Sequence, residues 1–407
     1  MQNVADLDLY HLPIDTQDFA NGPDRYMRAA REKHEWLAQS QFGVVVTEFE
    51  AIDEIMRMDD KLKTPADHVV EIMGGQGTNW ARFQHECLVA RDGKDHERIR
   101  LAINRGFLPK AVSTHVERIQ QVISDLLDDW APRKRFDFED FASRFPVAVM
   151  FGLLGIPRER IDDVKSWLED LGQSFCLDRS MFPQINEGFN RLWDFAEQLV
   201  AQRKRCGNPG APDLLDVLVE AELSGEITPT EVGDLILFLF AGGYDTSKNQ
   251  LGHIMNYMLD HPDHWQRCGE DRAFCDSVVG EALRHSGVAT SYRNVVTEFE
   301  YRGVNFPAGT MLIFTLGIAG RYSGPFEGGG AFNPLRTDAK RITAFGRGIH
   351  MCLGQFLARL QIAEGLHLMA QRLRNPRRDG EMVWRLFPGV WGPKQLPIAF
   401  DYGRQLR

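Results

Sequence analysis

No long hydrophobic run occurs in this sequence. The longest apolar stretch covers residues 235–241, far short of the roughly 20 residues that span a bilayer. Residues 1–8 contain neither the basic segment nor the apolar core of a secretory signal. We therefore expect no membrane association and a cytoplasmic location.

An excess of positive charge is also absent. Lys and Arg together number 47 against 57 Asp and Glu, which gives a formal net charge of −10. Nucleic-acid binding requires a basic face, so this balance argues against a nucleic-acid partner. An acidic protein partner would have to find a local basic patch.

Cysteine is scarce and lacks a regular pattern. A disulfide framework needs paired cysteines at regular spacing, and a zinc site needs clustered Cys or His ligands; neither arrangement occurs. We expect reduced thiols and no structural zinc. The six cysteines are at positions 87, 176, 206, 268, 275 and 352.

Linkers and internal repeats are missing as well, so residues 1–407 are predicted to form a single domain. Apolar spacings of three and four predict helices over most of the first two-thirds, and short alternating runs after Arg284 predict strands. The expected fold is mainly α with a smaller β region. Expected helices cover 51–58, 112–130, 141–154, 185–200 and 214–223, and expected strands lie near 43–46, 299–304, 311–314 and 396–400.

Two further segments are predicted individually. Thr228, Pro229 and Glu231 form the sequence pattern of a capping box at the start of a long helix. Residues 74–93 are rich in glycine and contain Trp80 and Phe83, so we expect a loop that covers a pocket.

One glycine-punctuated stretch, residues 345–354, presents Cys352 at the start of an apolar helical run. Glycines at 346, 348 and 354 permit a tight turn beneath a flat object. A helix N-terminus favours a thiolate, which is the metal-binding form of cysteine. The alternatives are a buried, inert thiol and a zinc site, but His350 alone cannot complete the latter.

The pattern of this stretch, F-G-x-G-x-H-x-C-x-G, resembles the heme-binding signature of the cytochrome P450 family and matches it at every specified position. The resemblance extends over about residues 44–400. It implies the single-domain P450 fold and a bound heme b (iron protoporphyrin IX). Cys352 would be the iron ligand, and Phe345 and His350 would be further heme-binding residues.

Three other motifs strengthen the resemblance. Residues 241–247, A-G-G-Y-D-T-S, resemble the oxygen-binding groove of the family. Thr246 is four residues from Gly242 and so shares its helix face; it would be the alcohol of the groove and Asp245 the acid. Taken alone, this motif would favour helix packing. Glu281 and Arg284 resemble the E-x-x-R pair, with Arg336 as its expected third member.

The fourth motif concerns the heme carboxylates. His96 and Arg100, four residues apart on one helix face, resemble the family's propionate-binding pair, and Arg293 and His350 would complete a cationic ring. Buried carboxylates need such charge-assisted donors. The alternative is a solvated basic face. The sequence departs from the family's A-N-R-D-P at residues 319–323 and continues into the glycine-rich 327–330, which predicts looser geometry before the cysteine loop.

The resemblance implies a monooxygenase that hydroxylates a small hydrophobic substrate with O₂, supplied with electrons by a ferredoxin and its reductase. A peroxide-driven enzyme and a heme-binding sensor without turnover are the alternatives. The expected pocket residues are Trp80, Phe83, Phe238, Gly242, Val288, Ala289, Val390 and Trp391, and the expected docking residues are Lys340, Arg341, Arg347 and Arg359.

Overall fold

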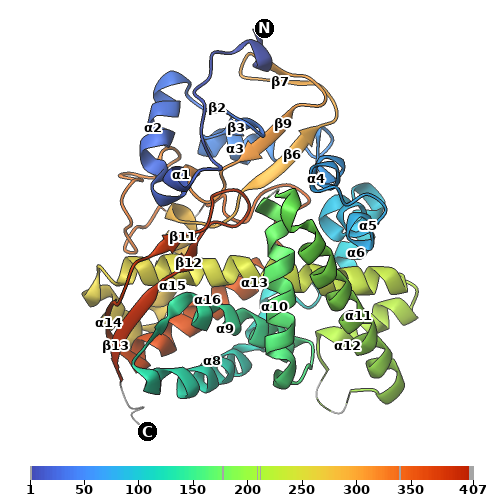
Figure 1. The fold of residues 1–407 in the computed structure, drawn as a ribbon, viewed down its shortest axis with the longest axis vertical. Helices are drawn as coiled ribbons and strands as arrows, with labels where there is room; N and C mark the ends of the chain where they lie inside the picture. The colour runs from blue at the N-terminus through green and yellow to red at the C-terminus, as the bar shows by residue number, and fades with distance from the viewer. Residues whose placement is uncertain (1, 177, 209, 211, 339–340, 403–407) are drawn as a thin grey trace.

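The computed structural model describes residues 2–402 except 177, 209, 211 and 339–340. Helices dominate, and the largest sheet lies to one side of them, whereas the C-terminal strands run beside the helices (Figure 1). This arrangement confirms the mainly α fold with a smaller β region. No helix in the described part of the chain is long and apolar enough to cross a membrane.

The helices are α1 (Gln17–Asn21), α2 (Pro23–Lys33), α3 (Phe49–Ile55), α4 (Ala66–Met73), α5 (Asn79–Glu86), α6 (Gly93–Asn104), α7 (Pro109–Ser113), α8 (Val116–Trp130), α9 (Phe138–Leu153), α10 (Ile161–Gly172), α11 (Phe182–Cys206), α12 (Leu214–Leu223), α13 (Pro229–Met258), α14 (Pro262–Glu270), α15 (Arg272–His285) and α16 (Gln355–Arg372).

The strands are β1 (Gln2–Asn3), β2 (Leu37–Ser40), β3 (Gly43–Val46), β4 (Leu62–Lys63), β5 (Arg135–Asp137), β6 (Ser291–Val295), β7 (Phe299–Tyr301), β8 (Val304–Phe306), β9 (Met311–Phe314), β10 (Leu373–Arg378), β11 (Val383–Trp384), β12 (Pro393–Gln395) and β13 (Pro397–Tyr402). The largest sheet has the order β2-β3-β9-β6-β4, in which β3 and β9 run parallel and the other neighbouring pairs run antiparallel.

Helix α13 is the 30-residue axis of the molecule and lies between the large sheet and the helical layer (Figure 1). Its predicted capping box is present: the Thr228 hydroxyl accepts from the Glu231 N–H at 3.2 Å, and the Glu231 carboxylate accepts from the Thr228 N–H at 2.8 Å. Pro229 occupies the first turn, where it costs no hydrogen bond. Helices α9 and α16 pack against α13.

Most predicted elements are present, with shifted ends. Strand β3 and helix α12 match the predicted 43–46 and 214–223, whereas α3, α9 and α11 each begin earlier than predicted. The run 299–304, for which strands and hairpins are predicted, contains the turn of a hairpin: β7 and β8 pair antiparallel, and Arg302 and Gly303 form the turn between them with φ of 49° and 79°.

Two predictions about segments are wrong. Residues 74–93 are not one loop, because Thr78 caps helix α5 by accepting from the Ala81 N–H at 3.2 Å, and Trp80 and Phe83 face the core. The helix predicted over 112–130 is divided into α7 and α8. Its break follows Ser113, where the Thr114 hydroxyl donates to the Ala111 carbonyl at 2.7 Å.

Candidate active site

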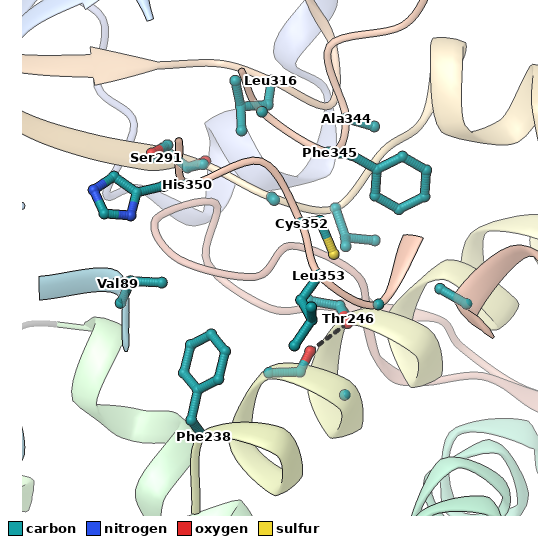
Figure 2. A pocket seen from close by; sticks show the side chains of 18 of the residues that line it. Val89, Phe238, Thr246, Ser291, Leu316, Ala344, Phe345, His350, Cys352 and Leu353 are labelled. Atoms are coloured by element: carbon teal, nitrogen blue, oxygen red, sulfur yellow. Dashed lines mark hydrogen bonds between the residues drawn. The ribbon is translucent and has the colours of Figure 1, made fainter. Parts of the chain in front are cut away.

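A cavity of about 420 Å³ lies between α13 and the loop that precedes α16. Figure 2 shows Cys352 on that loop and Thr246 on the facing helix, with Phe238 two turns earlier on the same helix. The walls are mostly apolar, and the volume is within the range of ligand sites. Further lining residues include Val89, Val288, Ala289, Leu316, Ala344 and Phe345.

The loop carrying Cys352 depends on two glycines with positive φ, Gly346 at 68° and Gly348 at 72°. A Cβ on Gly348 would lie 2.4 Å from Asp59 Oδ1, so no larger residue fits. The Asp59 carboxylate accepts from the Ile349 N–H at 3.2 Å. The Cys352 N–H donates to the Phe345 carbonyl at 2.9 Å. These contacts fix where the sulfur lies.

Burial raises the pKa of the Cys352 thiol. The Gly354 N–H, at the start of α16, and the Arg100 guanidinium both act to lower this pKa, but burial outweighs them. The expectation that the position at the helix N-terminus favours the thiolate is therefore wrong for the protein alone, although the N–H contact exists. A bound metal cation would reverse that balance, because metal ligation needs the thiolate.

Four basic side chains meet beside this loop, and we term them the loop cluster: His96, Arg100, Arg293 and His350. The rings of His96 and His350 pack edge to face with centroids 4.9 Å apart. His96 Nε2 and His350 Nδ1 are buried and lack a hydrogen-bond partner among the described residues. Burial, with the nearby charges of Arg293 and His96, lowers the pKa of His350 to about 4.

The two arginines of the loop cluster are only partly satisfied. Arg100 Nη2 donates to the Met351 carbonyl at 2.6 Å. Arg293 Nη1 donates to Ser291 Oγ and to the Tyr292 carbonyl, both at 2.8 Å. Burial lowers the pKa of Arg293 to about 10, and no carboxylate of the described chain lies within ion-pair distance of it. Both arginines line the cavity, so the cluster presents donors to an anionic ligand.

Helix α13 presents different residues to its two sides. The Thr246 hydroxyl donates to the Gly242 carbonyl at 2.8 Å, and both residues line the cavity. A Cβ on Gly242 would meet no atom within 4 Å, so this glycine faces open space. Asp245 does not line the cavity. Its Oδ1 lies 2.8 Å from the Nζ of Lys248.

Lys248 joins Asp245 to a second carboxylate. Its side chain is 1% exposed, and its Nζ lies 3.1 Å from Glu139 Oε1 on α9. Arg385 also donates to Glu139 at 2.7 Å. Two carboxylates and two cations therefore balance one another behind the cavity wall, and Asp245 is held there.

The predicted E-x-x-R residues form a second buried group, the Glu281 cluster: Glu281, Arg284 and Arg336. Arg284 donates to both oxygens of Glu281 at 2.7 and 2.6 Å, and Arg336 Nε lies 3.2 Å from the same carboxylate. Arg284 also donates to the carbonyls of Gly320 and Gly329, each at 2.7 Å. The atypical segments 319–323 and 327–330 are thus anchored by Arg284, contrary to the predicted looseness.

With this geometry in hand, comparison with known proteins identifies the chain. A profile of the family described as Cytochrome P450 matches residues 18–385. This chain belongs to the cytochrome P450 family. The luteothin monooxygenase of Streptomyces thioluteus is 31% identical to it, over 91% of this chain and 91% of that relative. The monooxygenase PikC of Streptomyces venezuelae is 29% identical, over 80% of this chain and 78% of that relative.

Solved structures agree on the P450 fold. The crystal structure of CalO2 superposes with a TM-score of 0.87 at 22% identity, covering 97% of this chain and 100% of that one. Since the curated relatives are named monooxygenases, this P450 is a monooxygenase.

The residues of this P450 fit the heme-thiolate group that the family implies. Cys352 supplies a sulfur at the cavity wall, and Gly346 and Gly348 keep the loop beneath it tight. The unpartnered nitrogens of His96 and His350 are costly in a buried site unless a ligand satisfies them. The carboxylates of a heme would do so.

Half of the predicted pocket residues line the cavity. Phe238, Gly242, Val288 and Ala289 do so. The other four do not, for reasons of packing: Trp80 and Phe83 belong to the core, Val390 pairs with Ala289 as a β-bridge, and Trp391 packs against His253. Sequence reasoning missed Gln84 and Thr290, which also line the cavity. Gln84 could have been predicted there only if α5 had been recognised as a helix, because Gln84 then lies one turn after Trp80.

The predicted docking residues differ in accessibility. Arg347 is 12% exposed and bonds Asp53, and Arg359 lies over the Phe345 ring at 5.2 Å. Arg341 is 64% exposed and donates to Asp53 at 2.6 Å. Lys340 lies outside the described residues. Arg347 and Arg359 are therefore parts of the cysteine-loop packing rather than a free basic surface.

Proposed function

We propose that this P450 inserts one oxygen atom of O₂ into a hydrophobic organic substrate, with electrons supplied by a ferredoxin and its reductase. When bound, heme b supplies the activation of oxygen. The observation that carries the proposal is an apolar cavity lined by Cys352, by the Thr246 hydroxyl and by three members of the loop cluster, Arg100, Arg293 and His350. The unpartnered His96 Nε2 lies beside it, since the His96 ring packs on that of His350. Residues 1–407 would act as one unit in the cytoplasm.

In this proposal each group of residues has one task. Cys352 holds the iron through its sulfur, and His96, Arg100, Arg293 and His350 bind the heme carboxylates. Charge-assisted hydrogen bonds of this kind are stronger than neutral ones, so the cluster would orient the ring plane as well as retain it. Phe345 would pack against the same group from the loop that carries Cys352.

Thr246 would hold a proton at its Oγ1, next to the position where oxygen binds. Its bond to the Gly242 carbonyl keeps the hydroxyl on the helix face of the cavity. Asp245 would resupply that proton, which requires its ion pair with Lys248 to open. The apolar walls exclude water and favour an apolar substrate.

A peroxide-driven reaction is the second candidate, and the placement of Asp245 favours it. The carboxylate is held by Lys248, which also pairs with Glu139 on α9, and it does not line the cavity. Peroxide brings both oxygen atoms and both electrons, so it makes no demand on an acid or on a ferredoxin.

The test compares oxidant sources on the heme-loaded protein with a substrate found by a spin-state binding screen. We expect product with NADH, a ferredoxin and its reductase under O₂, and much less with hydrogen peroxide alone. Thr246→Ala should bind heme normally yet release reducing equivalents as peroxide. Product from peroxide alone, unchanged in Thr246→Ala, would establish the second candidate; no product from either source would indicate a sensor.

A further inference from the structure

The polar side chains that line the cavity divide into bonded and unbonded ones. Thr64 donates to the Val89 carbonyl at 3.1 Å, Ser174 donates to the Leu171 carbonyl at 2.7 Å, and Thr246 donates to Gly242. These hydroxyls are satisfied by the chain itself. Gln84 and Thr290 are different.

Gln84 lines the cavity from α5 and is half-buried, and its side-chain amide makes no hydrogen bond with another described residue. Its helix is firmly held. Trp80 Nε1 donates to Ser174 Oγ at 3.3 Å, and Arg82 forms two bonds of 2.9 Å to Asp234 on α13. The amide of Gln84 is therefore brought to the cavity by a fixed element and left with its donors and acceptor unused.

Thr290 lies directly before β6 and also lines the cavity. Its backbone is fixed, because its N–H donates to the Gly389 carbonyl at 3.0 Å. Its Oγ1 is buried and has no partner among the described residues. Leaving a buried hydroxyl unpaired is costly, so a ligand in the cavity toward which this hydroxyl turns would be bound more tightly.

The charges of the cavity wall limit what such a ligand can be. The charged or basic side chains that line it are Arg100, Arg293 and His350, all members of the loop cluster, and none of the described lining residues is a carboxylate. A substrate carboxylate or ammonium would find no counter-ion beyond that cluster, and burying an unpaired charge is costly. Gln250 and Gln361 also line the cavity, but their amide groups already donate to the Ser286 carbonyl at 3.1 Å and to Ser247 Oγ at 2.6 Å, which leaves only their acceptor oxygens unpartnered among the described residues. Gln84 and Thr290 provide a neutral amide and a neutral hydroxyl, both of which can donate to oxygen.

We propose that the substrate carries a neutral carbonyl oxygen on an otherwise apolar skeleton, and that Gln84 binds this oxygen, with Thr290 as a second donor. The inference rests on the proposed function, since it names the substrate class for that cavity. Both residues act as specificity-determining contacts and take no part in the chemical step.

The test uses matched pairs of ligands that differ only in the carbonyl: xanthone against xanthene, and benzophenone against diphenylmethane. Dissociation constants are measured on the heme-loaded full chain by spin-state titration and independently by calorimetry. In the parent protein each ketone should bind about tenfold more tightly than its methylene partner, as one neutral hydrogen bond predicts.

Gln84→Leu and Thr290→Val keep the size of each side chain and remove its donor. Gln84→Leu should bring the ketone-to-methylene ratio close to one, Thr290→Val should reduce it by less, and binding of the methylene compounds should stay unchanged or improve. The matched control is Thr64→Val, which removes a hydroxyl that is already bonded and should leave the ratio intact.

Three outcomes would overturn the inference: a ketone-to-methylene ratio near one in the parent, a ratio that Gln84→Leu does not change, or a parent that binds none of the four compounds. None of these measurements requires turnover. Failure of the proposed oxygenation would appear in product formation, whereas failure of this inference would appear in the binding ratio.

Discussion

Two buried polar groups of this P450 are built from similar residues and differ in one respect. In the Glu281 cluster, Arg284 donates to a carboxylate and to backbone carbonyls, and each of its guanidinium nitrogens is bonded. In the loop cluster, His96 Nε2 and His350 Nδ1 have no partner in the described part of the chain, where the partners of Arg293 are a hydroxyl and a backbone carbonyl. The first group is complete in the chain alone, and the second is complete only with an anionic ligand.

This difference separates stability from function. A satisfied buried ion pair holds elements together, and its loss leaves a charge stranded in the core. Buried donors without a partner lower the stability of the folded protein until a ligand binds to them. Substitutions in the two clusters should therefore have opposite signatures: unfolding in the Glu281 cluster, and loss of ligand without unfolding around the loop.

The largest effect is expected at Cys352. Cys352→Ser should abolish the red-shifted Soret band of the reduced carbon monoxide complex, because a hydroxyl cannot replace an anionic sulfur. The matched control is Cys87→Ser, a second cavity-lining thiol, whose pKa burial raises to about 12. It should keep the thiolate spectrum. A Cys352→Ser protein with an unchanged band would refute the ligand assignment.

Next in size is Arg284→Gln, which leaves the Glu281 carboxylate buried with Arg336 as its remaining cation. We expect the free energy of unfolding to fall by about 3–5 kcal/mol, measured by urea denaturation of heme-free and heme-loaded protein. Arg336→Gln keeps the Arg284 pair and should cost less. Equal losses in the two variants would show that Arg284 is not the centre of this cluster.

Arg293→Gln tests the opposite signature. Among the described residues this buried guanidinium has no carboxylate partner, so its removal should leave the heme-free protein as stable as the parent, or slightly more stable. Heme should dissociate about tenfold faster or more, since a hydrogen bond to a charged group contributes about 1.5–3 kcal/mol. Heme transfer to a scavenger protein measures this rate. A less stable heme-free fold with unchanged heme retention would place Arg293 with the structural cluster instead.

The two clusters also show what could be predicted from sequence. The spacing within residues 345–354 and between Glu281 and Arg284 is local, so the motifs could be located with their residues. Which donors remain unpaired could not be predicted, because His96 and His350 come from segments about 250 residues apart and only the fold brings their rings together. Burial is likewise a property of the fold, and it reversed the expected balance at the Cys352 thiol.

The same limit applies to Asp245. Its neighbour Thr246 faces the cavity as predicted from the helix period, but the partner of Asp245 is Lys248, which Glu139 on α9 helps to hold. Glu139 lies far from residues 241–247 in the sequence, so the motif could not reveal its contact with Lys248. The glycines near residue 75 were equally misleading, since Thr78 starts a helix immediately after them and turns Gln84 toward the cavity.

The smallest effect is expected on ferredoxin docking, which depends on exposed charges rather than on the two buried clusters. Asp53 is surrounded by three guanidiniums: Arg57, Arg341 and Arg347. Burial alone would raise the pKa of Asp53, but these arginines, Arg347 foremost, hold it below its usual value. Arg57 and Arg341 are 57% and 64% exposed, so the group presents a local excess of positive charge beside the cysteine loop.

An acidic ferredoxin would be attracted to this excess, although the whole protein is acidic. Arg57→Glu combined with Arg341→Glu should raise the ferredoxin concentration for half-maximal turnover by a few fold at low salt, and high salt should remove most of the difference, because exposed charges are screened. The charge-matched control reverses two exposed arginines that are paired elsewhere, Arg25 and Arg377. Since both double variants change the net charge equally, only a local site predicts that they differ; equal behaviour at low salt would place the docking surface on another face.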